Sequence, residues 1–157
     1  MTFRFPVFGA VLLAGCAGGN LAQSVSAASA APAPDAFACA RDQVKAVEFT
    51  QSSYDTEALR ITARKFDETV RRPDVTFRRM VDRLEIQVAP GSAGEVSRIT
   101  VVAKTFAERA THRGPTEEQE RTSDRALTAA RTIVEKCSGE RSGEQVEGEV
   151  VPTVPQG

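Results

Sequence analysis

Few residues of this chain have the type and spacing that catalysis or metal binding requires. His112 is the only histidine, and the polar stretch 111–114 around it predicts an exposed loop. The sequence contains no Gly-x-Ser-x-Gly elbow, Gly-rich phosphate loop, Cys-x-x-Cys pair or clustered set of metal ligands. The carboxylates of Glu117, Glu118 and Glu120 are typical of a helix start. We therefore predict no catalytic residue, no metal site and no cofactor, and an enzyme is the least favoured class.

The N-terminal segment has the parts of a secretory signal. Arg4 is its single basic residue, residues 5–13 form a short apolar run, and Ala14 and Gly15 are small. The apolar run is too short to cross a bilayer, because a spanning helix needs about 20 apolar residues. We expect residues 1–15 to be a signal peptide that is removed.

The sequence Leu13-Ala14-Gly15-Cys16 resembles the lipobox of bacterial lipoproteins, in which an aliphatic residue, a small residue and Gly or Ala precede Cys. The resemblance covers about a tenth of the chain. It implies that Cys16 becomes the first residue and carries acyl chains, so that the membrane is a partner through a lipid anchor. Ala17 follows the cysteine where Asp would favour the inner membrane, which implies the periplasmic face of the outer membrane. The alternative is ordinary secretion with a later cleavage among residues 26–31.

Two cysteines remain once Cys16 is assigned to lipid, namely Cys39 and Cys137. Two cysteines in an oxidising envelope compartment predict one disulfide. Such a bond would close a loop of nearly the whole domain and would contribute about 4–5 kcal/mol in the chain-entropy treatment. A redox or metal-binding pair is the alternative.

Charge and composition divide the chain into segments. The chain has 20 Lys and Arg against 21 Asp and Glu, whereas nucleic-acid-binding proteins are basic, so no nucleic-acid partner is predicted. Residues 16–35 are rich in Ala, Ser and Pro and predict a flexible tether after the lipidated cysteine. Residues 36–138 are long enough for one folded domain. Residues 139–157 are acidic without an apolar period and predict a disordered tail.

Alternating apolar and polar residues predict half-buried strands. The four stretches with this alternation are 47–50, 59–64, 83–88 and 98–104. The turn residues at 90–94 make the last two strands antiparallel neighbours.

Helical spacing of apolar residues predicts two helices. The first covers 35–46 with Asp35 as its N-cap. The second covers 117–136, where Thr116 and Gln119 have the spacing of a capping box. These elements predict an α+β fold, a two-layer sandwich with a four-stranded antiparallel sheet and two helices on one face in the order α-β-β-β-β-α.

The exposed face of the predicted sheet is basic and is the one candidate binding surface. Its cations are Arg60, Arg64, Arg83, Arg98 and Lys104, and its acids are Glu48 and Glu85. The planar guanidinium of arginine suits carboxylates and phosphates, so the candidate partner is an anionic envelope component or an acidic partner protein. The alternative is a solvated charged face without a specific partner. Further arginines are expected in the nearby loop, at Arg71, Arg72, Arg78 and Arg79.

The expected function is that of a membrane-anchored cell-envelope lipoprotein acting as a non-catalytic binding or assembly module. A structural lipoprotein whose domain is a spacer is the alternative.

Overall fold

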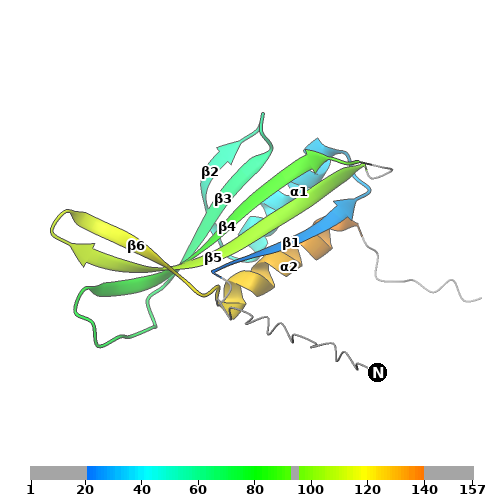
Figure 1. The fold of residues 1–157 in the computed structure, drawn as a ribbon. Coiled ribbons are helices and arrows are strands. Elements are labelled where there is room, and N and C mark those ends of the chain that lie inside the picture. Colours follow the sequence, from blue (N-terminus) through cyan, green and yellow to red (C-terminus); the bar gives the residue numbers. More distant parts are fainter. Residues whose placement is uncertain (1–20, 93–95, 140–157) are drawn as a thin grey trace, which may run out of the picture.

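The computed structural model describes residues 21–92 and 96–139, so the predicted signal peptide, the predicted lipidation site Cys16 and the predicted tail after residue 139 lie outside the described residues. The described elements are, in chain order, β1 (Ala22–Ser29), α1 (Ala33–Ala46), β2 (Thr50–Asp55), β3 (Arg60–Asp67), β4 (Phe77–Pro90), β5 (Ser97–Thr111), β6 (Gly114–Glu120) and α2 (Asp124–Ser138). The strands form one antiparallel sheet in the order β1-β5-β4-β3-β2, and β6 also pairs with β5. Both helices cover the same face of this sheet (Figure 1). The α+β arrangement is present, but the prediction of a four-stranded sheet is wrong because the sheet has six strands.

The first additional strand is β1, which comes from residues predicted to be a tether. All eight of its residues pair with β5, from Ala22 opposite Lys104 to Ser29 opposite Ser97. Val25 and Ala27 pack against the core, whereas the alternate residues are exposed. An edge strand needs backbone hydrogen bonds on one side and only one half-buried face, so small side chains suffice. The tether prediction is therefore wrong for residues 22–29, and the folded unit begins before residue 36.

The second additional strand is β6, which comes from the predicted start of the second helix. Thr116 and Gln119 form no capping box, because both lie in β6 opposite β5. The N-cap of α2 is Ser123, whose hydroxyl accepts a hydrogen bond from the Ala126 amide at 3.0 Å. The strand β5 continues to Thr111, so only a tight turn around His112 separates it from β6. The strand β5 extends beyond β1, and the backbone groups of its residues 105–111 would lack hydrogen-bond partners on that side without β6. Pairing with these groups favours a strand at 114–120 more strongly than the local sequence favours a helix.

The other elements agree with the alternation but differ at their ends. The predicted strands 59–64, 83–88 and 98–104 lie within β3, β4 and β5, except that Leu59 precedes β3. The antiparallel pairing of β4 with β5 is confirmed, although residues 93–95 of the turn lie outside the described residues. The strand predicted at 47–50 begins only at Thr50, and α1 begins at Ala33 after Pro32, with Asp35 inside its first turn.

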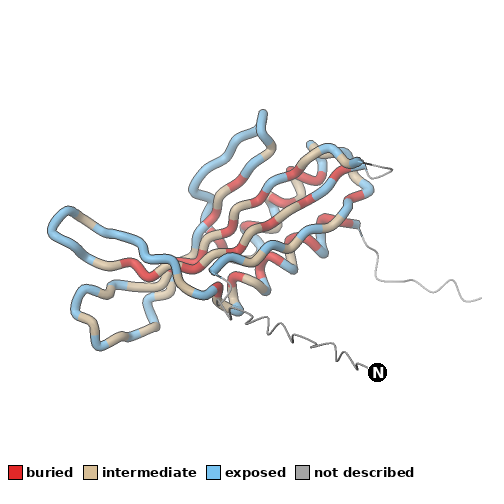
Figure 2. The backbone as a smooth tube through the Cα atoms, in the orientation of Figure 1, coloured by how far each residue is buried: buried red, intermediate tan, exposed pale blue. Residues whose placement is uncertain are grey.

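The core lies between the sheet and the two helices. Its largest fully buried apolar side chains include Ile61, Leu84, Ile86 and Ile99 from the sheet and Ile133 from α2. Burying each such side chain stabilises the fold by roughly 1.5–3 kcal/mol. Figure 2 shows buried stretches along β3, β4, β5 and both helices, whereas β2 is exposed throughout.

The predicted disulfide between Cys39 and Cys137 is present and joins the two helices. The Cα atoms are 5.8 Å apart, a normal separation for a bridged pair. Because the bond connects α1 to the last turn of α2, it ties together two elements that are far apart in the sequence.

The strands β4 and β5 continue beyond the helices and form a projection with β6. We define the arm as residues 67–79 and 106–121, which comprise the β3–β4 loop and the β5–β6 hairpin with their flanking residues (Figure 1). The Ala110 amide donates to the Thr76 carbonyl at 2.7 Å, and this bond joins the loop to the hairpin. The arm therefore extends one end of the sheet past its helical layer.

Candidate functional site: the uncovered face of the sheet

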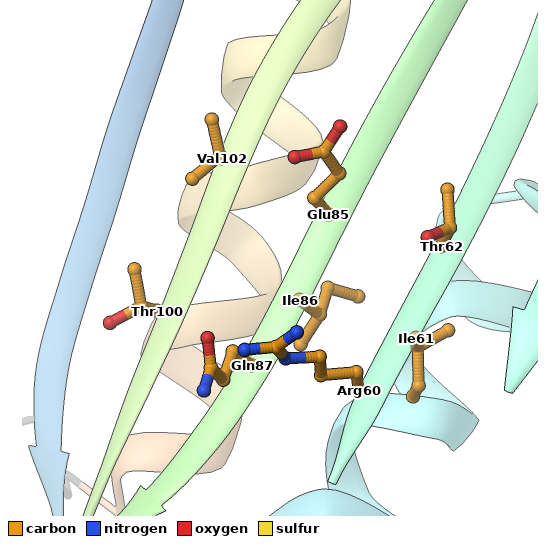
Figure 3. Close-up of a pocket in the computed structure, with 8 residues that line it drawn as sticks. All are labelled: Arg60, Ile61, Thr62, Glu85, Ile86, Gln87, Thr100 and Val102. Atoms are coloured by element: carbon orange, nitrogen blue, oxygen red, sulfur yellow. The ribbon is translucent and has the colours of Figure 1, made fainter. Parts of the chain in front are cut away.

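The face of the sheet opposite the helices carries all five cations predicted for the binding surface. Arg60 and Arg64 come from β3, Arg83 from β4, and Arg98 and Lys104 from β5. They alternate along their strands with the buried core residues and so point away from the helices. Figure 3 shows this face with the helices behind the strands.

Three of the cations lie directly opposite one another in adjacent strands. The register pairs Arg64 with Arg83 and Arg83 with Lys104. Like charges in directly opposite positions destabilise a sheet unless they are offset. Glu117 accepts from the Arg83 guanidinium at 2.6 Å, and Glu85 accepts from the Lys104 ammonium at 2.8 Å. Two of the five predicted cations are therefore already neutralised within the chain.

Arg60 and Arg64 are different, because neither forms an ion pair with a described acid. Both are exposed. The Arg64 guanidinium carbon lies 5.3 Å from the centre of the Phe66 ring, which favours its stacking there. Arg98 donates to the Ser26 hydroxyl at 3.3 Å on the neighbouring strand. The cations best placed to receive an external anion are therefore Arg60 and Arg64.

A shallow hollow of about 290 Å³ lies beside Arg60 on this face. Its lining residues are Arg60, Ile61, Thr62, Glu85, Ile86, Gln87, Thr100 and Val102. Figure 3 shows the Arg60 side chain reaching from β3 across β4 to the side chain of Gln87. The hollow therefore combines a guanidinium with hydroxyl and amide groups, a set that can hydrogen-bond a carboxylate or phosphate. Its one carboxylate, Glu85, is paired with Lys104.

The described residues offer little for catalysis at this face. His112 lies at the exposed turn between β5 and β6, as predicted, and lines a separate hollow with Thr76. Thr62 and Thr100 are the hydroxyl groups of the hollow, and no described histidine is near them to act as a base. No group of three or more potential ligands among the described residues could hold a metal ion. The arrangement can bind and orient an anion.

The arginines expected in the loop are largely committed to ion pairs in the arm. The Arg72 guanidinium donates to both carboxylate oxygens of Glu120 at 2.5 Å. Glu108 pairs with Arg79 at 3.2 Å and with Arg78 at 3.5 Å. Arg109 pairs with Asp74 and with Glu118. These pairs fasten the loop to the hairpin, so the loop arginines are not a continuation of the candidate binding surface.

Acid should loosen the arm. The hydrogen bonds from Arg72 hold the pKa of Glu120 below its usual value of 4.5, against the opposing effect of desolvation. A lowered carboxyl pKa adds stability that is complete above the usual value and is lost as pH falls through the folded value. We expect amide exchange in β6, corrected for intrinsic rates, to accelerate between about pH 5 and pH 3.

The control for this pH effect is Arg72→Gln, which removes the charged partner of Glu120. The variant should exchange faster near neutral pH and should lose most of the acid-dependent change in β6. Equal acid dependence in the variant and the wild type would mean that another group controls the arm.

Asp82 is a buried polar residue that the alternation did not identify as important. Its side chain is fully buried on the helix side of β4. One carboxylate oxygen accepts from the hydroxyls of Thr105 at 2.7 Å and Ser123 at 2.8 Å, and the other accepts from the Arg125 Nε at 2.7 Å. Ser123 is also the N-cap of α2, so Asp82 holds the start of this helix on the sheet. The sequence does contain a sign of this role, because Asp82 occupies the first position of the alternating series 82, 84, 86 and 88, whose other members are apolar and face the core.

Comparison with known proteins adds no family assignment, because no protein-family model and no curated protein matches this chain. No helix in the described part of the chain is both long and apolar enough to span a membrane.

Proposed function

We propose that this protein is a lipid-anchored protein of the cell envelope, on the periplasmic face of the outer membrane, and that it binds an anionic partner without catalysis. The lipobox resemblance at Cys16 and the Cys39–Cys137 disulfide, which suits an oxidising compartment, support the location. The observation that carries the binding role is the pair Arg60 and Arg64, which have no described acidic partner and share one face of β3, where Arg60 lines the hollow. The partner is an acidic protein or another envelope component with carboxylate or phosphate groups.

The anchor is tested by the intact mass of the protein extracted from membranes, with and without reduction and alkylation. We expect a chain that begins at Cys16 and carries acyl groups, with two thiols released only by reductant. A lipid-free chain that begins later would contradict the anchor.

The binding role is tested by the double variant Arg60→Gln/Arg64→Gln. We expect it to weaken binding of an oligoglutamate peptide about tenfold or more, because each charged hydrogen bond contributes roughly 1.5–3 kcal/mol. Nuclear magnetic resonance titration measures this, and the shifts of the wild type should concentrate at residues 60–62, 85–87 and 100–102. Thermal stability should change little, because both side chains are exposed.

The matched control is Lys45→Gln/Arg131→Gln, which removes the same charge from exposed positions on the helical layer. This variant should bind the peptide as the wild type does. Equal weakening in both variants would mean that the peptide responds only to net charge, and the proposed surface would then be wrong.

A structural spacer is the second candidate, and the internal ion pairs favour it. Glu117 and Glu85 neutralise Arg83 and Lys104, which is the arrangement expected of a charged face adapted to solvent. Unchanged oligoglutamate affinity and an unchanged envelope phenotype in the Arg60→Gln/Arg64→Gln variant would support the spacer.

A further inference from the structure

The distance between the lipid anchor and the fold is short. The strand β1 begins at Ala22, so only residues 17–21 separate it from Cys16. A fully extended chain spans at most about 3.3–3.6 Å per residue, which limits the separation of Cys16 from Ala22 to roughly 20 Å. If Cys16 is lipidated, as the proposed function requires, the domain lies close to the membrane.

The anchored end of the fold is the base of the arm. The Leu21 carbonyl accepts hydrogen bonds from the side-chain Nε2 of Gln119 at 2.9 Å and from the Thr122 hydroxyl at 3.2 Å. The opposite end of β1 is Ser29, whose hydroxyl donates to the Cys137 carbonyl at the end of α2. The eight residues of β1 separate these ends by about 25 Å. The anchor therefore holds the arm end of the molecule nearest the membrane.

The tip of the arm can reach the same surface as the anchor. Residues 114–119 of β6 lead from the tip to Leu21, and a strand of this length covers about 17 Å. Leu21 is five residues from Cys16, and a chain of that length spans at most about 18 Å. One membrane plane can therefore contact the arm tip while it holds the acyl chains of Cys16.

Three arginines of the arm lie outside its ion pairs. Every acid in the arm forms an ion pair with a described base, and these acids are Asp67, Glu68, Asp74, Glu108, Glu117, Glu118 and Glu120. Arg71, Arg113 and Arg121 are exposed and form no ion pair with a described acid, although Arg71 donates to the Glu68 and Val70 carbonyls. The seven arginines of the arm balance its seven acids, but these three guanidiniums are available to contact lipid phosphates.

An apolar side chain projects from the same end. Val75 lies in the β3–β4 loop and is 98% exposed, the highest exposure among the large apolar residues. The end with Val75 and the three arginines outside ion pairs therefore suits a lipid headgroup region.

We propose that the arm docks on the anionic membrane surface that holds the lipid anchor. Arg71, Arg113 and Arg121 contact lipid phosphates, and Val75 enters the interface between headgroups and acyl chains. The turn at 56–59 and Val96, which lie at the opposite end of the sheet, are then directed away from the membrane. This orientation rests on the proposed anchor at Cys16.

Tryptophan provides a clean test, because the chain contains none. The acylated full chain carrying Val75→Trp would be reconstituted into vesicles of phosphatidylglycerol and phosphatidylethanolamine with brominated acyl chains, which quench nearby tryptophan. The matched control is Val96→Trp, at an exposed position at the other end of the sheet. We expect quenching of Val75→Trp to be at least severalfold stronger than that of Val96→Trp. Adding Arg71→Gln, Arg113→Gln and Arg121→Gln should reduce the quenching of Val75→Trp at least twofold.

The wild-type chain offers a second readout that does not depend on a variant. Amide exchange at residues 71–78 and 109–114 should slow when the protein moves from detergent micelles to the same vesicles. Equal quenching at both positions, or none at Val75→Trp in a protein whose mass shows acyl chains, would overturn the docking of the arm and leave the anchor intact. A mass without acyl chains would overturn the anchor itself and the docking that rests on it.

Discussion

Replacing Cys39 and Cys137 together with alanine is expected to lower the free energy of unfolding by about 2–5 kcal/mol. The bond closes a loop over a sequence separation of 98 residues and joins α1 to the last turn of α2. In the chain-entropy treatment a loop of this size restricts the unfolded chain strongly. The helices would still pack on the sheet, but the unfolded state would gain freedom that the bond now removes.

Denaturant unfolding with and without a reductant measures this contribution. The reductant should destabilise the wild type by about as much as the double substitution does and should leave the variant unchanged. A variant that unfolds at the wild-type denaturant concentration would show that the bond adds no net stability, which native-state strain or a compact unfolded state would explain.

Replacing Asp82 with alanine is expected to cost about 3 kcal/mol. The change leaves the hydroxyls of Thr105 and Ser123 without their buried acceptor and removes the closest acidic partner of Arg125. We expect the lower end of the range for a broken buried pair, because the Arg125 side chain is 37% exposed and keeps its contact with Asp67. The loss should loosen the start of α2, since Ser123 is both a partner of Asp82 and the N-cap.

Two further variants separate the roles of charge and hydrogen bonding at Asp82. Asp82→Asn keeps an acceptor for the two hydroxyls and removes the charge, so it should cost less than Asp82→Ala. Ser123→Ala removes the N-cap and should cost about 1 kcal/mol. Thermal unfolding and amide exchange at residues 124–128 would report both changes. A stable Asp82→Ala protein with normal exchange there would contradict the role given to this residue.

Local patterns in the sequence were sufficient wherever a segment carries its own apolar face. Leu84, Ile86 and Val88 alternate with polar residues, and Ile99, Val101 and Ala103 do the same, so the central strands and their antiparallel pairing were predictable. The two helices were predictable for the same reason, because Val44 and Ile133 belong to apolar series at helical spacing that are buried in α1 and α2.

The edges of the sheet were not predictable, because an edge strand is selected by its partner more than by its own side chains. The segment 22–29 has few large apolar residues, and its gain comes from backbone pairing with β5. The segment 114–120 has a helix-start composition, yet its glutamates meet Arg83, Arg109 and Arg72 when the segment lies in β6. Neither the backbone pairing of segment 22–29 nor the ion pairs of segment 114–120 can form before β4 and β5 have folded.

The candidate site divides in the same way. The alternation of charged and apolar residues placed Arg60, Arg64, Arg83, Arg98 and Lys104 on one face. The ion pairs of Glu117 with Arg83 and of Glu85 with Lys104 were not predictable. Each pair joins residues of two different strands, so it depends on how the strands are aligned in the sheet.

The sequence by itself determined the central strands, the two helices, the pairing of Cys39 with Cys137 and the basic character of one sheet face. Each of these depends on residue type and on periodicity within one segment, or on there being two cysteines left to pair. The tertiary structure alone decided the six-strand sheet, the arm, the burial of Asp82 and the choice of arginines that lack an acidic partner. These features depend on contacts between segments distant in the chain, whose free energy appears only when the strands pair and the helices pack.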